Sequence, residues 1–152
     1  MKIIRSILLI ILILILLVSS LFYLTGKKLY DTKISETDLD TKISQIRSNE
    51  NFVTLDNVPK YYLNAVVSVE DRRFYNHGAI DFIALARALV SNIRQGEFKE
   101  GGSSITQQTA KNLYFITETD VIARKSAEII MSYELEKHYS KDKILEIYIN
   151  TI

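Results

Sequence analysis

Glu70 is the first side chain whose position suggests chemistry. It closes a series that starts at Leu63 and recurs at spacings of three, four and seven residues, so on a helix its carboxylate lies in line with an apolar stripe. Charge beside apolar surface is unfavourable, and a carboxylate kept ionised there by neighbouring arginines is a candidate general base. The alternative is that the helix has ended and Glu70 points into water or pairs with Arg72 or Arg73.

A second candidate segment follows the glycine pair at residues 101–102. Ser104-x-x-Gln107 fits a capping box, in which the two side chains bond to backbone N–H groups at a helix start, and this alone explains both residues. A helix start behind a glycine turn also offers free N–H groups to an anion, and Lys111 lies one turn beyond Gln107 and Gln108. The segment therefore predicts a helix and allows a phosphate or diphosphate site at its start.

A third group, Arg124, Lys125 and Glu128, falls on one face of a predicted helix. A solvated salt bridge within the helix explains it most simply, although basic residues before the acid are the poorer order for such a pair. The two histidines, His77 and His138, are too far apart in sequence to suggest a metal pair. We expect each to be a hydrogen-bonding or surface residue.

The composition excludes several classes of site and partner. The 152 residues include 19 Lys and Arg, 18 Asp and Glu, and no Cys. A disulfide scaffold, a thiolate metal site and a cysteine nucleophile are therefore excluded. A net charge of +1 leaves no basic excess to neutralise the phosphates of a duplex, so we expect no nucleic-acid partner.

Residues 6–25 contain no charged side chain, and Ile7 to Leu17 are all Ile or Leu. About 20 such residues form a helix long enough to cross a bilayer. A cleaved secretory signal is the alternative, but the residues that follow lack its small-residue cleavage pattern. We therefore expect a single membrane-spanning anchor. Basic residues flank both of its sides, so the charge rule alone does not orient it.

Beyond the span, helical patterns dominate and no sustained alternation of apolar and polar residues predicts a strand. A short amphipathic helix is expected after a Ser35-x-x-Asp38 start, followed by a brief extended segment at residues 52–55. Five further helices are predicted, at 59–70, 81–96, from 104, 120–139, and from 140 to the end of the chain. The predicted organisation is a tail at 1–5, a membrane helix at 6–25, a juxtamembrane stalk at 26–55 and a mostly α domain at 56–152.

Four sequence blocks, taken in order, resemble the glycosyltransferase module of peptidoglycan polymerases. This is the lysozyme-like domain of monofunctional transglycosylases and of bifunctional class A penicillin-binding proteins. The blocks are Glu70 to His77, Gly101 to Gln108 with Lys111 and Asn112, Arg124-Lys125-x-x-Glu128, and Lys143 to Asn150. Four ordered blocks within residues 56–152 are far more specific than any one motif. Such domains lie outside the cytoplasmic membrane, so the resemblance implies a cytoplasmic N-terminus and an extracellular domain.

The resemblance implies that lipid II is polymerised into β-1,4-linked glycan with release of undecaprenyl diphosphate. Glu70 is then expected to remove the proton of the attacking sugar hydroxyl. Glu128 is expected to organise the basic groups or to hold a divalent cation, Mg²⁺ or Mn²⁺. The other expected substrate-binding residues are Asp71, Phe74, His77, Ser103, Gln107, Gln108, Lys111, Arg124 and Lys125. Implied partners are lipid II, the growing glycan, the cytoplasmic membrane, and cell-wall synthesis or division proteins.

This sequence departs from the family pattern at several positions. Asp120 stands where an arginine is common, and Ala79 stands where glycine is usual. Ile152 follows the fourth block almost directly, where relatives continue, so we expect an incomplete, C-terminally truncated domain. Two alternatives stay open. One is a lysozyme-like hydrolase with Glu70 and Glu128 as its paired carboxylates, and the other is a truncated membrane protein that binds lipid II without turnover.

Overall fold

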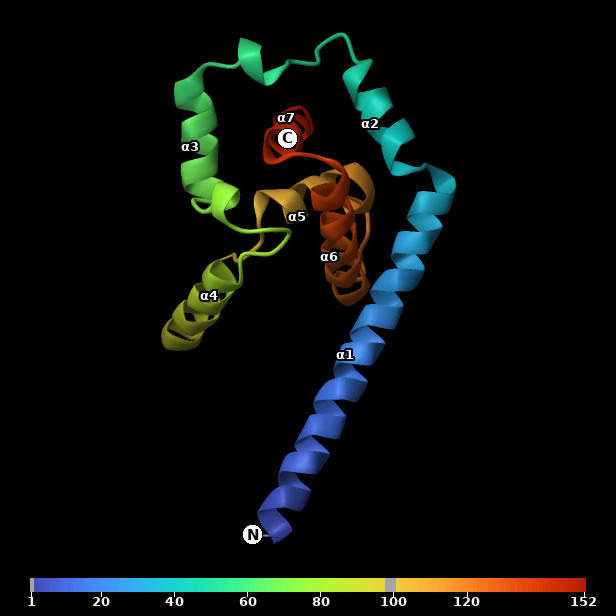
Figure 1. Ribbon diagram of the computed structural model, residues 1–152, viewed down its shortest axis with the longest axis vertical. Helices are drawn as coiled ribbons and strands as arrows, with labels where there is room; N and C mark the ends of the chain where they lie inside the picture. Colours follow the sequence, from blue (N-terminus) through green and yellow to red (C-terminus); the bar gives the residue numbers. More distant parts are fainter. Residues whose placement is uncertain (1, 98–100) are drawn as a thin grey trace.

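The computed structural model describes residues 2–97 and 101–152, and within these ranges it contains helices and no strand (Figure 1). The prediction of a mostly α protein is therefore confirmed. The helices are α1 (Lys2–Glu36), α2 (Leu39–Arg47), η1 (Leu55–Asn57), α3 (Lys60–Glu70), η2 (Phe74–Asn76), α4 (Phe82–Gln95), α5 (Ile105–Ala110), η3 (Lys111–Phe115), α6 (Val121–His138) and α7 (Lys141–Ile149). η3 is a π-helical turn that continues α5 directly.

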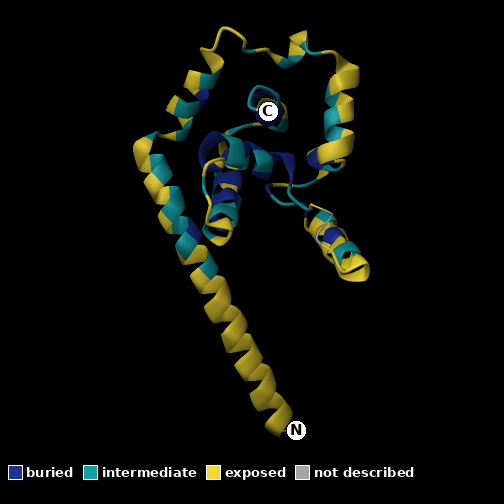
Figure 2. Cartoon of the chain, turned by 180° about the vertical axis from the view of Figure 1, so that it is seen from behind, coloured by how far each residue is buried: buried dark blue, intermediate teal, exposed yellow. Residues whose placement is uncertain are grey.

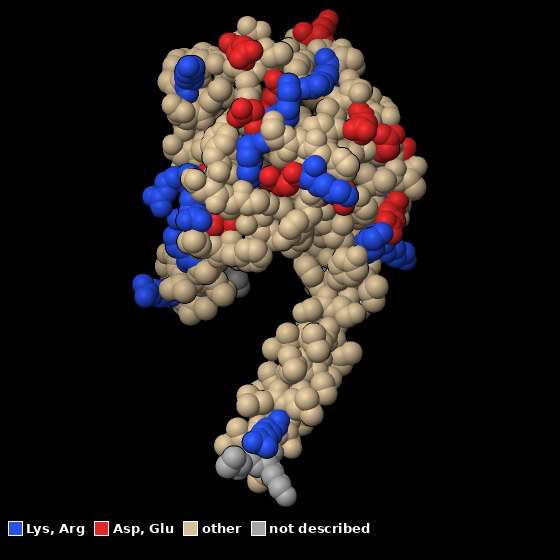
Figure 3. Space-filling view, in the orientation of Figure 1, with Lys and Arg blue, Asp and Glu red and all other residues tan. Residues whose placement is uncertain are grey.

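The N-terminal part of α1 stands apart from the rest of the molecule. Its side chains are exposed from residue 3 to residue 21 (Figure 2), and Figure 3 shows no charged atoms on it except a basic group near its N-terminal end. Among the described residues, α1 is the helix long and apolar enough to cross a membrane. The helix itself continues beyond Thr25, the predicted end of the membrane span, to Glu36, because Lys and Asp side chains such as the Lys27–Asp31 pair are compatible with a helix.

The C-terminal part of α1 packs on α6. Gly26 lies so close to Ser126 and Ala127 that a Cβ atom added to it would fall 2.1 Å from Ser126 Oγ and 2.7 Å from the Ala127 backbone nitrogen. Further along α1, Leu29 and Ile34 pack against the core. Part of the segment expected to form a stalk is thus in contact with the domain, and the membrane helix is held directly against α6.

Short polar side chains define where the helices begin. Asp81, Asp120 and Ser140 cap α4, α6 and α7 by accepting hydrogen bonds from backbone N–H groups, as the predicted helix starts require. The predicted start of α2 was wrong, because Ser35 lies within α1. Asp38 caps α2 instead, and its Oδ1 accepts from Thr41 N at 2.9 Å.

The buried core lies where α5, η3, α6 and α7 meet (Figure 2). Its fully buried large apolar side chains are Phe74, Ile105, Phe115, Met131, Leu135, Ile144, Leu145 and Ile147. α7 sits inside an arc formed by the end of α1, α2, η1 and α3 (Figure 1). α4 projects from this body toward the same end of the molecule as the membrane helix, and most of its large apolar side chains are exposed.

Glu146 holds the arc against α7. Its buried carboxylate accepts from Arg47 Nη2 at 3.0 Å, from Lys143 Nζ at 3.2 Å and from the Leu55 backbone N–H at 3.2 Å. Burial by itself raises the pKa of Glu146, but these hydrogen bonds outweigh it and lower the pKa below its ordinary value. Leu55, expected in an extended segment, instead begins the single turn η1.

Candidate active site

Three of the four sequence blocks meet at one cleft of about 520 Å³ between the end of α3 and the pair α5 and α6. Its lining residues are Val69, Glu70, Gly101, Ser103, Gln107, Gln108, Lys111, Arg124, Lys125 and Glu128. Every predicted site residue is therefore at this cleft except Asp71, Phe74 and His77. The elements place an exposed acid from α3 in the same cleft as three basic side chains from η3 and α6.

Glu70 is the last residue of α3 and is exposed. Its Oε2 accepts a hydrogen bond from Gln108 Nε2 at 3.0 Å. It does not sit in an apolar environment, because the helix ends at this residue and the chain turns away. The alternative pairing with Arg73 is also absent, since Arg73 Nε donates to Asp81 Oδ2 at 3.0 Å. The carboxylate is thus free on one side to meet a substrate and oriented on the other by an amide.

The acidic group on α6 is more buried than a surface salt bridge. The Glu128 side chain has 0% exposure, and its two oxygens accept from Lys125 Nζ at 2.6 Å and Arg124 Nη1 at 3.3 Å. Lys125 Nζ also donates to Ser103 Oγ at 2.9 Å. A solvated pair is therefore excluded. Glu128 fixes two cations at the cleft, and Ser103 ties one of them to the glycine segment.

The capping box predicted at α5 is present, and it occupies amides that were predicted to be free. Ser104 Oγ accepts from the Gln107 N–H, and Gln107 Oε1 accepts from the Ser104 N–H. The next amide, that of Ile105, donates to Asp71 Oδ2 at 3.0 Å. These three N–H groups are already satisfied by protein atoms and are unavailable to an anion, whereas the basic side chains that line the cleft can contact a phosphate.

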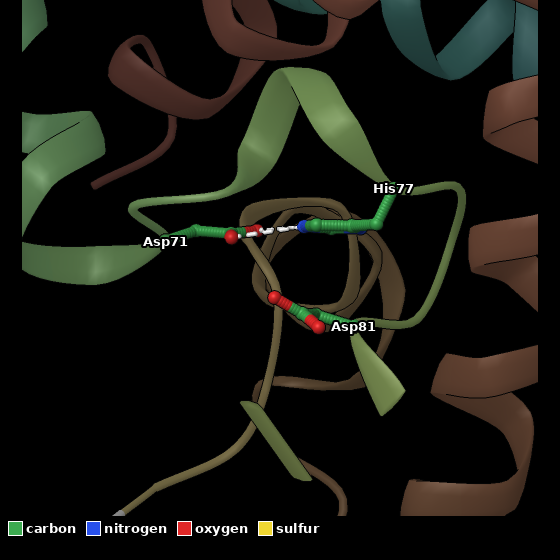
Figure 4. Close-up of side chains that lie close together, drawn as sticks. All are labelled: Asp71, His77 and Asp81. Atoms are coloured by element: carbon green, nitrogen blue, oxygen red, sulfur yellow. Dashed lines mark hydrogen bonds and ion pairs between the residues drawn. The ribbon is translucent and has the colours of Figure 1, made fainter. Parts of the chain in front are cut away.

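Asp71, His77 and Phe74 support the cleft from behind rather than lining it. Asp71 is buried and its carboxylate contacts His77 Nε2 at 2.9 and 3.0 Å (Figure 4). Phe74 has 0% exposure, so it has no surface with which to contact a sugar. Asp71 also accepts a hydrogen bond from the N-terminus of α5. Because Asp71 directly follows Glu70 in the chain, these contacts fix the position of Glu70.

Asp71, His77 and Asp81 form the one group of three potential metal ligands found in residues 2–97 and 101–152. Figure 4 shows Asp81 beside the Asp71–His77 pair. Asp81 already accepts from the Ile83 and Ala84 N–H groups and from Arg73. These oxygens hold the loop before α4, which is a structural use of the kind that ordinarily explains a buried carboxylate.

Glu128 likewise does not fit the expected divalent cation. Both of its oxygens face ammonium or guanidinium groups. The other acidic residue in the lining of the cleft is the exposed Glu70, so the lining offers few carboxylate ligands to a cation. A hard cation prefers several oxygen ligands. The site residues therefore provide positive charge from Lys and Arg side chains.

A smaller cavity of about 190 Å³ adjoins the cleft and shares Glu70 and Ser103 with it. Its lining also includes three arginines, Arg72, Arg73 and Arg87, together with Asp71 and Asp81. No sequence block singled out Arg87, because it is an isolated basic residue on a helix and only the fold brings it to Glu70. Glu70 therefore lines both the basic cleft and a smaller cavity of mixed charge.

Comparison with known proteins gives one family. The family model described as "Transglycosylase" matches residues 38–152. Penicillin-binding protein 1F of Bacillus subtilis (strain 168) is 41% identical over 121 residues, which cover 80% of this chain and 17% of that protein. Penicillin-binding proteins 1A of Aquifex aeolicus (strain VF5) and Neisseria lactamica are 43% and 45% identical over 101 residues, 66% of this chain and 14% and 12% of theirs. The chain thus spans less than a fifth of the length of these relatives. With most of its residues matched by the family model, the chain belongs to the transglycosylase family.

Proposed function

We propose that this protein is a peptidoglycan glycosyltransferase that polymerises lipid II into β-1,4-linked glycan strands. The observation that carries the proposal is the single cleft in which exposed Glu70 shares a lining with Lys111, Arg124 and Lys125. Joining two sugars from a lipid diphosphate donor needs a base for the acceptor and positive charge for the leaving group. The cleft provides both.

In the proposed step, the 4-hydroxyl of the acceptor sugar attacks the anomeric carbon of the donor. Glu70 takes the hydroxyl proton as the new C–O bond forms. The bond between the anomeric carbon and the diphosphate oxygen breaks, and its electron pair leaves with undecaprenyl diphosphate. Lys111, Arg124 and Lys125 stabilise that growing negative charge. We propose that the acceptor approaches through the smaller cavity, which shares Glu70 with the cleft and is also lined by Arg72 and Arg87.

The state of the Arg124 side chain supports an anionic ligand. Its Nη1 is held by Glu128, while its buried Nε has no hydrogen-bond partner among the described residues. Buried donors are normally satisfied, so an unsatisfied one is a feature to explain. We propose that a bound phosphate draws the guanidinium toward the cleft, where Nε also finds a hydrogen-bond partner.

The packing of the membrane helix supports a lipid substrate. Gly26 directly follows the uncharged stretch and touches Ser126, which lies next to Lys125 on α6. This contact keeps the basic residues close to the level at which the apolar helix leaves the bilayer, where the diphosphate of a membrane lipid lies. We propose a cytoplasmic N-terminus and an extracellular domain, with cell-wall synthesis or division proteins as partners.

The hydrolase alternative is disfavoured by the burial of Glu128. Glycoside hydrolysis needs two carboxyl groups that flank the scissile bond and act on sugar or water. Glu128 has no exposed surface, and both its oxygens are bound to cations. It therefore lacks the free oxygen that a second catalytic carboxylate requires, and it serves the basic pair instead.

Product analysis with the purified full chain in detergent tests the proposal. Incubation with lipid II is expected to give glycan strands longer than the substrate and free undecaprenyl diphosphate. Incubation with finished cell-wall glycan is expected to give no shorter fragments. Fragments without polymer would instead support the hydrolase, and saturable lipid II binding without product would support the reading as a binding protein.

A further inference from the structure

A chain of hydrogen bonds links the candidate base to a buried tyrosine on the last helix. Glu70 Oε2, at the end of α3, accepts from Gln108 Nε2 on α5 at 3.0 Å. The other end of the same amide, Gln108 Oε1, accepts from Tyr148 Oη on α7 at 3.1 Å. Tyr148 is 3% exposed and does not line the cleft. The Gln108 amide thus joins α3, α5 and α7 beside the candidate base Glu70.

The chemistry of the three groups allows one direction of donation along these hydrogen bonds, from Tyr148 through Gln108 to Glu70. An ionised carboxylate only accepts, so it faces the Gln108 NH₂ group. The amide oxygen then faces Tyr148, whose hydroxyl can donate to it. If the amide rotated by half a turn, its oxygen would face the carboxylate and two acceptors would repel. The tyrosine hydroxyl therefore favours the amide orientation that supports Glu70.

Tyr148 is suited to act as a permanent donor. Burial raises the pKa of its hydroxyl, and the nearby charge of Glu70 raises it further. The hydroxyl therefore keeps its proton at neutral pH. Its backbone lies in α7 among fully buried neighbours such as Ile144 and Ile147, which fix its position.

Resting on the proposed function, we propose that Tyr148 is a positioning residue for the glycosyl transfer, which acts through Gln108 to hold the Glu70 carboxylate in place. It makes no contact with substrate. Its removal should therefore slow the step in which Glu70 takes a proton while leaving the affinity for lipid II unchanged.

The test compares Tyr148→Phe with Tyr114→Phe in the purified full chain. Tyr114 is a matched control, because it is also a buried tyrosine and its hydroxyl donates to a backbone oxygen, that of Thr37, away from the cleft. Tyr148→Phe is expected to lower kcat for lipid II polymerisation by about fivefold to tenfold, the equivalent of one hydrogen bond, with KM unchanged. Tyr114→Phe is expected to keep the wild-type kcat. Equal kcat values for the two variants, at equal melting temperatures, would overturn the inference while leaving the proposed function standing.

A double-variant cycle separates positioning from general weakening of the fold. If Tyr148 acts through Gln108, then Tyr148→Phe should lower kcat no further in a Gln108→Ala background. Losses that simply multiply would show that Tyr148 acts by another route, and would overturn the inference.

A measurement that needs no turnover covers the case in which the proposed function itself fails. In the ¹⁵N-labelled chain in detergent micelles, the side-chain NH₂ signals of Gln108 are assigned by their loss in Gln108→Ala. Exchange of these protons with water should be slow in the wild type, faster in Tyr148→Phe and unchanged in Tyr114→Phe. Exchange that Tyr148→Phe leaves unchanged would mean that the tyrosine does not hold the amide.

Discussion

Replacing Glu128 by Gln tests whether a buried acid holds the basic pair at the cleft. The amide has nearly the same shape as the carboxylate, so the packing of α6 is kept. The negative charge is lost, and one acceptor oxygen becomes an NH₂ donor that faces Lys125 or Arg124. The wild-type carboxylate is fully buried, at 2.6 Å from Lys125 Nζ and 3.3 Å from Arg124 Nη1. In the variant, two cations lie side by side without their counter-ion.

The expected loss in the free energy of unfolding follows from the burial of the Glu128 carboxylate. Removing one member of a fully buried ion pair destabilises a protein by about 3–5 kcal/mol. The loss here should be smaller, because the Lys125 and Arg124 side chains keep 39% and 18% exposure and can be partly hydrated. We expect a loss of about 2–4 kcal/mol in the free energy of unfolding, in the range of one or two hydrogen bonds to charged groups. For a chain of this length that lowers the melting temperature by about 5–15 °C.

Thermal and urea unfolding in detergent, followed by circular dichroism, measures this loss. Glu134→Gln is the matched control, because Glu134 is on the same helix and pairs with Lys137 at 3.7 Å and His138 at 3.4 Å but is partly exposed. Such surface pairs contribute about 0.5 kcal/mol or less. If Glu128→Gln and Glu134→Gln unfold at the same temperature, the buried acid does not hold the pair as the structure implies.

Three further predictions address the anchor, the leaving group and acid stability. Gly26→Ala should destabilise the chain by about 1–3 kcal/mol, because its new Cβ overlaps Ser126. Gly78→Ala is the control, since no atom lies within 4 Å of its new Cβ, and it should melt like the wild type. Equal melting temperatures for the two variants would contradict the contact between α1 and α6. Lys111→Ala should raise KM for lipid II about tenfold at an unchanged melting temperature, and an unchanged KM would remove Lys111 from the diphosphate site. The pKa of Glu146 is lowered in the folded state, so its stabilising effect is present above its unfolded pKa and is lost as pH falls through the folded pKa. The gap in unfolding free energy between wild type and Glu146→Gln should therefore be largest at neutral pH and close in acid; a gap independent of pH would show that the Glu146 charge contributes nothing.

Helix ends were predictable where a short-range rule decides them. Asp81 and Gly96 bound α4, because one caps the first N–H groups and the other adopts the positive φ of 67° that favours glycine. The capping box between Ser104 and Gln107 follows from the same local chemistry. The ordered blocks also pointed to residues that line the cleft, such as Glu70, Lys111 and Glu128, whereas Asp71, Phe74 and His77 lie outside its lining.

Features that depend on contacts between distant residues were not predictable from local pattern. The carboxylate of Glu128 looked like part of a solvated pair, and only the packing of α6 against α1 and α5 buries it. Gly26 was expected to begin a juxtamembrane stalk, yet it packs closely against Ser126 and Ala127 of α6. The bond from Tyr148 to Gln108 joins residues 40 positions apart, so no periodicity could reveal it.

The most direct test of the account is the rate at which Glu70→Gln polymerises lipid II. The amide keeps the shape of the side chain but accepts no proton, so the rate should fall by about 10²–10⁴-fold, the usual contribution of a general base. Glu134→Gln, at a glutamate remote from the cleft lining, serves as the control and should keep the wild-type rate. A Glu70→Gln protein that makes glycan as fast as the wild type would contradict the account, because the acid at the centre of the cleft would then take no part in the reaction.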